Sequence, residues 1–102
     1  MGLCVALRSE SGEQTDLIAD EKNLIPGLLG GPDWRDFPML ASIDRYGDTT
    51  FNSVQIERFL VEWNTLFQRA TTSEETNLLQ AVKSLAERSL LKVHQYLVFI
   101  GD

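Results

Sequence analysis

Apolar side chains recur at helical spacing in two long stretches of the second half of the chain. The first stretch runs from Ser53 to about Ala70, and the second runs from Thr72 to about Leu91. In both stretches apolar residues fall three and four positions apart, which gathers them on one face of a helix. They are Ile56, Phe59, Leu60, Trp63, Leu66, Phe67 and Ala70 in the first and Leu78, Leu79, Val82, Leu85, Ala86 and Leu90 in the second. The pattern predicts two amphipathic helices that pack antiparallel across a short turn.

Polar residues mark where these helices begin and which face meets solvent. Asn52 and Ser53 are favoured N-cap residues of the first helix. Thr72 or Ser73 can cap the second helix, with Glu75 or Thr76 in its first turn as in a capping box. The remaining polar residues of the first helix, which we expect to face solvent, are Glu57, Arg58, Glu62, Asn64 and Gln68.

Three shorter segments have the composition of β-strands. Leu3–Leu7 is apolar at every position, which is typical of a strand covered on both sides. Residues 9–13 predict a hairpin turn in which Gly12 adopts the unusual backbone angle, followed by a more polar strand at Gln14–Ala19. Val93–Ile100 ends in a β-branched and aromatic run that suits a central strand.

The second of these strands has the features of a sheet edge. Asp16 and Asp20 carry charges that discourage pairing with another chain. The following residues, Asp20–Ile25, predict one helical turn that Pro26 ends.

The middle of the chain is less regular. Residues 26–38 hold three prolines and three glycines, which predicts a loop. Pro38–Ile43 predicts a short helix with Pro38 at its first position. Ile43–Asn52 then predicts a turn that leads into the long helix, with Gly47 at positive φ. The fold class that follows is α+β: a small, mostly antiparallel three-stranded sheet with an antiparallel helical hairpin packed on one face, in one domain over residues 1–102.

Composition narrows the class of protein. The chain has 102 residues, of which 43% are apolar, which is enough for one core without disulfides. Cys4 is the one cysteine, so no disulfide forms within the chain. We find no stretch long enough to span a membrane and no signal peptide, and therefore expect a soluble cytoplasmic protein.

The charge is unevenly distributed along the sequence. The formal net charge is −6, and residues 10–48 alone carry nine acidic and three basic side chains. Nucleic-acid binding needs clustered lysine and arginine, so this distribution argues against it. An acidic N-terminal half of the chain favours a basic protein partner.

Two clusters are candidates for contact with such a partner. Asp44, Tyr46 and Asp48 place two carboxylates and a phenol within five residues, and the 26–38 loop carries Trp34, Arg35 and Asp36. Tryptophan and arginine are enriched at the energetic centres of interfaces. The alternatives are that Asp44, Gly47 and Asp48 only shape the turn, and that Trp34 covers the core.

A hard cation is a further alternative ligand for the Asp44–Asp48 segment, because carboxylate oxygens suit it. The spacing does not match a calcium loop: position 3 is Tyr46, and position 12 is Gln55 where a bidentate glutamate is required. We therefore predict no metal site and no cofactor.

The segment from Ile43 to Gln55 also carries a resemblance. Its pattern I-D-x-Y-G-D-T-x-F-N-x-x-Q resembles a recurring signature of small uncharacterised bacterial proteins, and Val93–Asp102 resembles the ending of the same group. The resemblance covers roughly the C-terminal two-thirds of the chain. It implies a bacterial, cytosolic, single-domain protein, and no activity or catalytic residue comes with it.

Two functional hypotheses follow. The first is a non-enzymatic protein-interaction module, such as an immunity- or antitoxin-like inhibitor that binds a basic partner through Trp34, Arg35, Asp36, Asp44, Tyr46 and Asp48. Apolar residues on both sides of the first and last strands add self-association as another form of partner. The second hypothesis is a small metal- or ligand-binding protein or enzyme that uses Asp44, Asp48 and His94. We favour the first because of the charge asymmetry, the small size and the absence of a catalytic set of residues; no nucleophile stands near His94 in the sequence.

Overall fold

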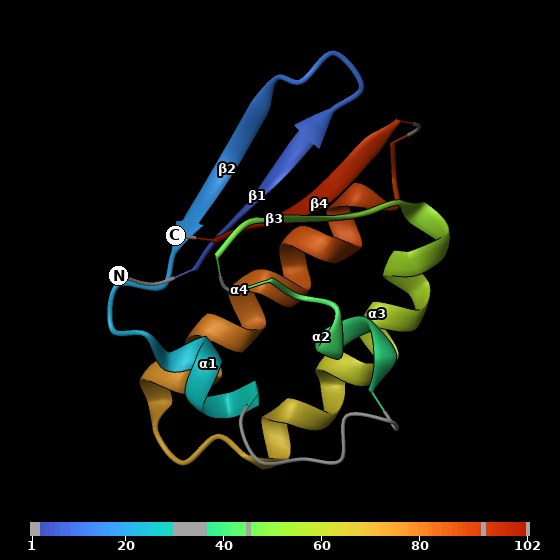
Figure 1. Ribbon diagram of the computed structural model, residues 1–102. Coiled ribbons are helices and arrows are strands. Elements are labelled where there is room, and N and C mark those ends of the chain that lie inside the picture. Colours follow the sequence, from blue (N-terminus) through green and yellow to red (C-terminus); the bar gives the residue numbers. More distant parts are fainter. Residues whose placement is uncertain (1–2, 30–36, 45, 93, 102) are drawn as a thin grey trace.

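The computed structural model describes residues 3–29, 37–44, 46–92 and 94–101, which form four strands and four helices (Figure 1). The strands are β1 (Cys4–Ser9), β2 (Gln14–Ala19), β3 (Asp48–Phe51) and β4 (Gln95–Ile100), and the helices are α1 (Leu24–Leu29), α2 (Pro38–Ala41), α3 (Ser53–Thr65) and α4 (Ser73–Ser89), with a 3₁₀ turn at Leu66–Gln68. None of the helices in this described part has the length and hydrophobicity to cross a membrane.

The four strands form one sheet in the order β2-β1-β4-β3, and every neighbouring pair is antiparallel. The predicted α+β class and antiparallel sheet are confirmed, but the prediction of three strands was wrong. The fourth strand is β3, in the segment that we had predicted as a turn. Its four residues pair with β4, about fifty positions later in the chain, and so short a segment gives little local signal.

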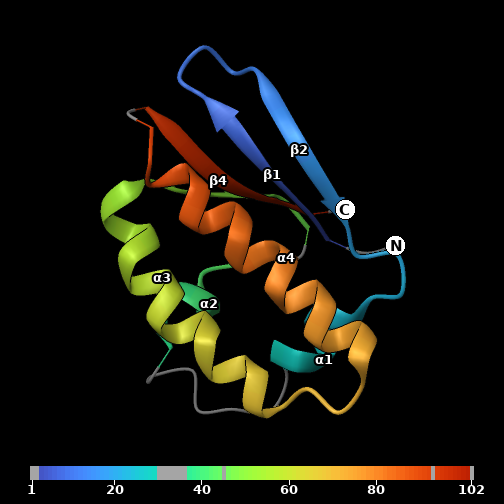
Figure 2. The ribbon, with the colours of Figure 1, turned by 180° about the vertical axis from the view of Figure 1, so that it is seen from behind.

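The long helices α3 and α4 lie on one face of the sheet, as the two opposite views show (Figures 1 and 2). Val5 and Leu7 of β1 and Leu97 and Phe99 of β4 belong to the core that these helices cover. The centre of this core is aromatic: the ring of Phe59 lies 5.2 Å from Trp63 and 5.6 Å from Phe99. Both helix starts are as predicted, with capping boxes at Asn52 and Thr72.

The β1–β2 hairpin has the predicted turn and an unpredicted bulge. Gly12 has a φ of +92°, and its N–H donates to Ser9 O. The register then shifts by one residue between the Leu7–Thr15 and Val5–Ile18 pairs, and Asp16 has a φ of +57°. Such a bulge redirects a side chain, and Asp16 here forms an ion pair with Arg88 of α4.

Asp20 is not the exposed edge residue that we predicted. It is 3% exposed, and its two carboxylate oxygens accept hydrogen bonds from the backbone N–H groups of Leu24 and Ile25 at 2.8 and 2.7 Å. These are orphan donors at the start of α1. Pro26 lies inside this helix and does not end it, because a proline in the first turn removes no helical hydrogen bond.

The prediction for Glu62 was also wrong, because it placed this residue on the solvent face of α3. It is 2% exposed, and its Oε1 accepts hydrogen bonds from Met39 N at 3.0 Å and Leu40 N at 3.1 Å. Arg58, one turn earlier, forms an ion pair with the same carboxylate. Glu62 therefore closes the N-terminus of α2 from a different helix.

We expect Glu62→Ala to lower the free energy of unfolding by about 2 kcal/mol, because it leaves two backbone donors and Arg58 without an acceptor. Urea denaturation measures the loss. Glu57→Ala, on the exposed side of the same helix, is the matched control and should stay within about 0.5 kcal/mol of the parent. Equal losses in the two variants would contradict the capping role.

The carboxylate of Glu75 caps the N-terminus of α4. Glu75 Oε1 accepts hydrogen bonds from the backbone N–H groups and the hydroxyls of Thr71 and Thr72. The Thr71 N–H makes the largest contribution to lowering the pKa of Glu75. A lowered pKa in the folded state adds stability above the unfolded pKa, and this is lost as the pH falls through the folded value.

NMR titration of the side-chain carboxyl carbon therefore tests the cap at Glu75. The midpoint should lie at a lower pH in the native protein than in the same protein unfolded in urea, because only the native state has these donors in place. Coincident midpoints would show that the hydrogen bonds do not persist in solution.

Candidate functional site

The turn at residues 44–47 is held by its own side chains and by both neighbouring strands. Asp44 Oδ1 accepts a hydrogen bond from Tyr46 N at 2.8 Å, and Asp44 N donates to Thr49 Oγ1 at 2.9 Å. Gly47 O accepts from Gly101 N, just after β4, at 2.8 Å. The backbone on which Tyr46 stands is therefore fixed at several points.

At Gly47 the lack of a side chain leaves room for the carboxylate of Asp44. Among the described glycines, Gly12 has positive φ and Gly47 does not, so the predicted backbone role of Gly47 was wrong. A Cβ at position 47 would lie 2.9 Å from Asp44 Oδ2, closer than real Cβ contacts. The absence of a side chain lets the Asp44 carboxylate fold back on the turn.

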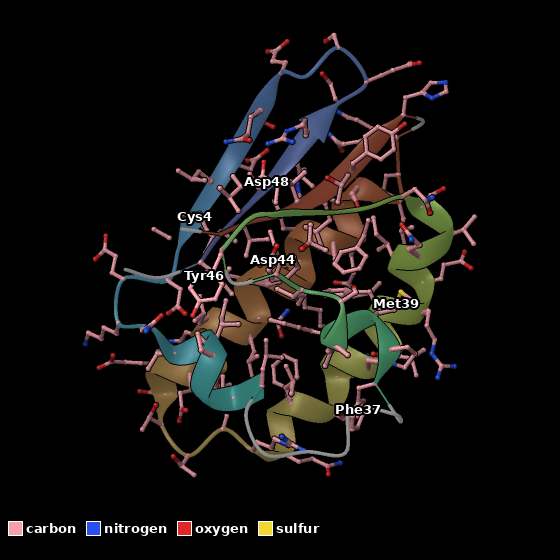
Figure 3. The ribbon with its side chains drawn as sticks, in the orientation of Figure 1. Cys4, Phe37, Met39, Asp44, Tyr46 and Asp48 are labelled. Atoms are coloured by element: carbon pink, nitrogen blue, oxygen red, sulfur yellow. The ribbon has the colours of Figure 1, made fainter. Side chains whose placement is uncertain are left out.

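The three predicted site residues of this segment have different surroundings (Figure 3). Tyr46 is 84% exposed. Asp48, at the start of β3, forms an ion pair of 3.5 Å with Arg8 of β1, while Asp44 is occupied by the turn. Trp34, Arg35 and Asp36 lie outside the residues that the structure describes.

This geometry does not bring His94 close to Asp48, as the catalytic or metal-binding alternative requires. His94 precedes β4 and lies 3.6 Å from Glu10, whereas Asp48 pairs with Ile100 at the other end of that strand. Within residues 3–29, 37–44, 46–92 and 94–101, no three His, Cys, Asp or Glu side chains lie close enough to share a metal ion.

Arg8, a residue that we had not singled out, lies on the sheet face turned away from the helices. Its Nη2 donates to Gln14 Oε1 of β2 at 2.8 Å and lies 3.5 Å from Asp48 Oδ2 of β3. The guanidinium therefore links the two edge strands across β1 and β4. Ala6 and Val98, paired on this face, are 0% exposed. The apolar composition of these strands thus does not by itself require a partner.

Comparison with family models, with curated proteins and with solved structures gives no match to this chain. Its surface geometry is therefore the basis for assigning a function.

We expect Gly47→Ala to lower the free energy of unfolding by about 1 kcal/mol, because the new Cβ displaces the Asp44 carboxylate from the Tyr46 N–H. A double-mutant cycle with Asp44→Ala, followed by urea denaturation, isolates this clash. In the Asp44→Ala background, Gly47→Ala should be neutral or stabilising, since alanine restricts the unfolded chain. An undiminished loss in that background would show that Asp44 is not the obstacle.

Proposed function

We propose that this chain is a non-enzymatic protein-interaction module that binds a basic protein partner, in the manner of an immunity- or antitoxin-like inhibitor. The observation that supports this most directly is Tyr46, a large aromatic side chain that is 84% exposed on a turn held by one backbone–backbone and two backbone–side-chain hydrogen bonds. Tyrosine is among the residues most enriched at the energetic centres of interfaces.

The fixed turn matters because ordering a loop on binding reduces affinity. Each side chain or segment that must be immobilised costs about 0.5–1.5 kcal/mol of binding free energy. Here the backbone of the turn is already ordered by Asp44, Thr49 and Gly101, so mainly the Tyr46 ring has to be fixed. An exposed aromatic side chain on an ordered backbone is therefore well suited to anchor a partner.

Charge around Tyr46 selects the kind of partner. Asp44 and Asp48 flank it in sequence, both are exposed, and residues 10–48 carry the acidic excess of the chain. An acidic surface speeds association with a basic protein and disfavours acidic ones. Trp34, Arg35 and Asp36 belong to the proposed surface on the sequence argument alone. A second copy of the chain is the other form of partner that we consider.

The test is comparative capture of binding proteins by three tagged versions of the chain. Asp44→Asn with Tyr46→Ala removes the ring and one charge but keeps an acceptor for the Tyr46 N–H position. Glu57→Gln with Val61→Ala is the matched control, since it removes one charge and one exposed apolar side chain from α3. Quantitative mass spectrometry of proteins bound from the source cells compares the three.

We expect a basic protein to be enriched by the parent and the control and to be reduced at least about tenfold by the turn variant, as for loss of an interface anchor. Its binding should weaken further with added salt. Sedimentation of the purified chain distinguishes self-association as the alternative. If every bound protein is retained equally by the turn variant, the surface is assigned wrongly.

A further inference from the structure

Exposed apolar side chains gather where α4 leads into β4. Leu91 is 83% exposed and Leu90 is 36% exposed, although the sequence had placed Leu90 on the inward face of the helix. Val54, at the start of α3, is 77% exposed and lines the same hollow as these two leucines. Apolar side chains grouped in this way mark binding surfaces more often than scattered ones do.

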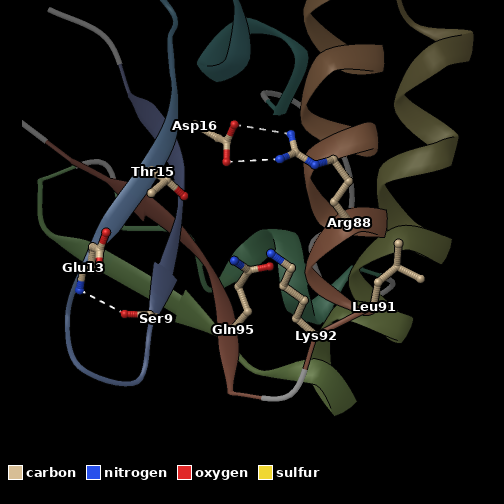
Figure 4. Close-up of a pocket in the computed structure, with 8 residues that line it drawn as sticks. All are labelled: Ser9, Glu13, Thr15, Asp16, Arg88, Leu91, Lys92 and Gln95. Carbon is tan, nitrogen blue, oxygen red and sulfur yellow. Dashed lines mark hydrogen bonds and ion pairs between the residues drawn. The ribbon is translucent and has the colours of Figure 1, made fainter.

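Leu91 stands between two hollows in the surface. One, of about 500 Å³, lies between the β1–β2 hairpin and the end of α4 (Figure 4). The other, of about 430 Å³, lies between the start of α3 and the start of β4. Leu91, Lys92 and Gln95 line both hollows and form the wall that they share. The volumes are within the range of small-molecule sites.

Two of the charged residues that line the first hollow, Arg88 and Asp16, are already paired with each other. Arg88 donates two hydrogen bonds, of 3.4 and 3.2 Å, to the carboxylate of Asp16, which the β2 bulge turns toward α4. His94 lies 3.6 Å from Glu10. In contrast, the side chains of Lys92 and Gln95 form no hydrogen bond or ion pair with any residue that the structure describes. The shared wall thus presents an ammonium and an amide beside apolar side chains.

We propose that this wall binds a small apolar α-carboxylate. Lys92 and Gln95 donate to the carboxylate, and the apolar group lies against Leu90, Leu91 and Val54 in the second hollow. This chemistry is common to a free apolar amino acid and to the C-terminal residue of a peptide. Glu13 lines the first hollow, and in this proposal its carboxylate receives the ammonium group that the free amino acid has and a peptide C-terminus lacks.

The experiment is an NMR titration of the full chain with three probes: leucine, N-acetylleucine and leucinamide. Leucine or N-acetylleucine should shift the amide signals of Leu91 and Gln95 saturably, with a Kd on the order of 1 mM for so small a ligand. Leucinamide should bind at least about tenfold more weakly than the better of them, because it lacks the carboxylate that Lys92 and Gln95 hold.

The relative affinities of the two carboxylate probes, leucine and N-acetylleucine, identify the source of the natural ligand. Tighter binding of leucine, reduced by Glu13→Gln to the level of N-acetylleucine, indicates a free amino acid. Binding of N-acetylleucine at least as tight as that of leucine indicates a peptide C-terminus. Either order supports the carboxylate site.

Two variants separate the site from general charge effects. Lys92→Gln should weaken the binding of the carboxylate probes at least about tenfold. Lys22→Gln makes the same change of charge at a lysine that pairs with Glu74 at the other end of α4, and it should leave binding unchanged. Absence of saturable shifts at concentrations well above the expected Kd would overturn the proposal. Equal binding by leucinamide, or by the Lys92→Gln protein, would do so too.

Discussion

The irregular middle of this protein depends on two buried carboxylates that accept hydrogen bonds from backbone amides. Asp20 closes the start of α1, and Glu62 closes the start of α2. Helices of six and four residues are not stable alone, and their first N–H groups have no partner within the helix. Because Glu62 fixes α2 on α3, it also fixes Ser42, whose carbonyl lies 3.5 Å from Thr49 Oγ1. Thr49 also accepts a hydrogen bond from Asp44 N, so these contacts connect α2 to the Tyr46 turn and to β3.

Elements with local signals could be predicted from the sequence, and elements with distant partners could not. Helical periodicity and the cap residues Asn52 and Thr72 located α3 and α4, and Gly12 located the hairpin turn. Strand β3 was missed because its four residues are held in an extended conformation by their pairing with β4, a distant segment of the chain. Glu62 was misplaced because a charge on an amphipathic helix normally faces water. Its hydrogen-bond partners lie 22 and 23 positions away, where periodicity gives no information.

The two proposed surfaces could also be predicted only in part, because the sequence does not show the distant contacts of their residues. Clustering in the sequence singled out Asp44, Tyr46 and Asp48, but it did not show that Asp44 braces the turn while Asp48 pairs with Arg8. Leu90 has helical spacing and was therefore counted as core. Because α4 ends at Ser89, Leu90 and Leu91 leave the helix and become exposed.

Strand β4 relates the two proposed surfaces to each other. Its C-terminal end is tied to the Tyr46 turn through Gly101 N and Gly47 O, and its first residue, Gln95, forms part of the Leu91 wall. It is paired along its length with β1 and over four residues with β3, in one continuous register with each. Coupling between sites requires an element with two arrangements that both ligands bias. A strand paired in this way, with Leu97, Val98 and Phe99 fully buried, would have to break both pairings to change its register. We therefore infer that the two surfaces act independently. A ligand at Lys92 then leaves the affinity at Tyr46 unchanged, except where that ligand is a segment of the protein that binds at Tyr46.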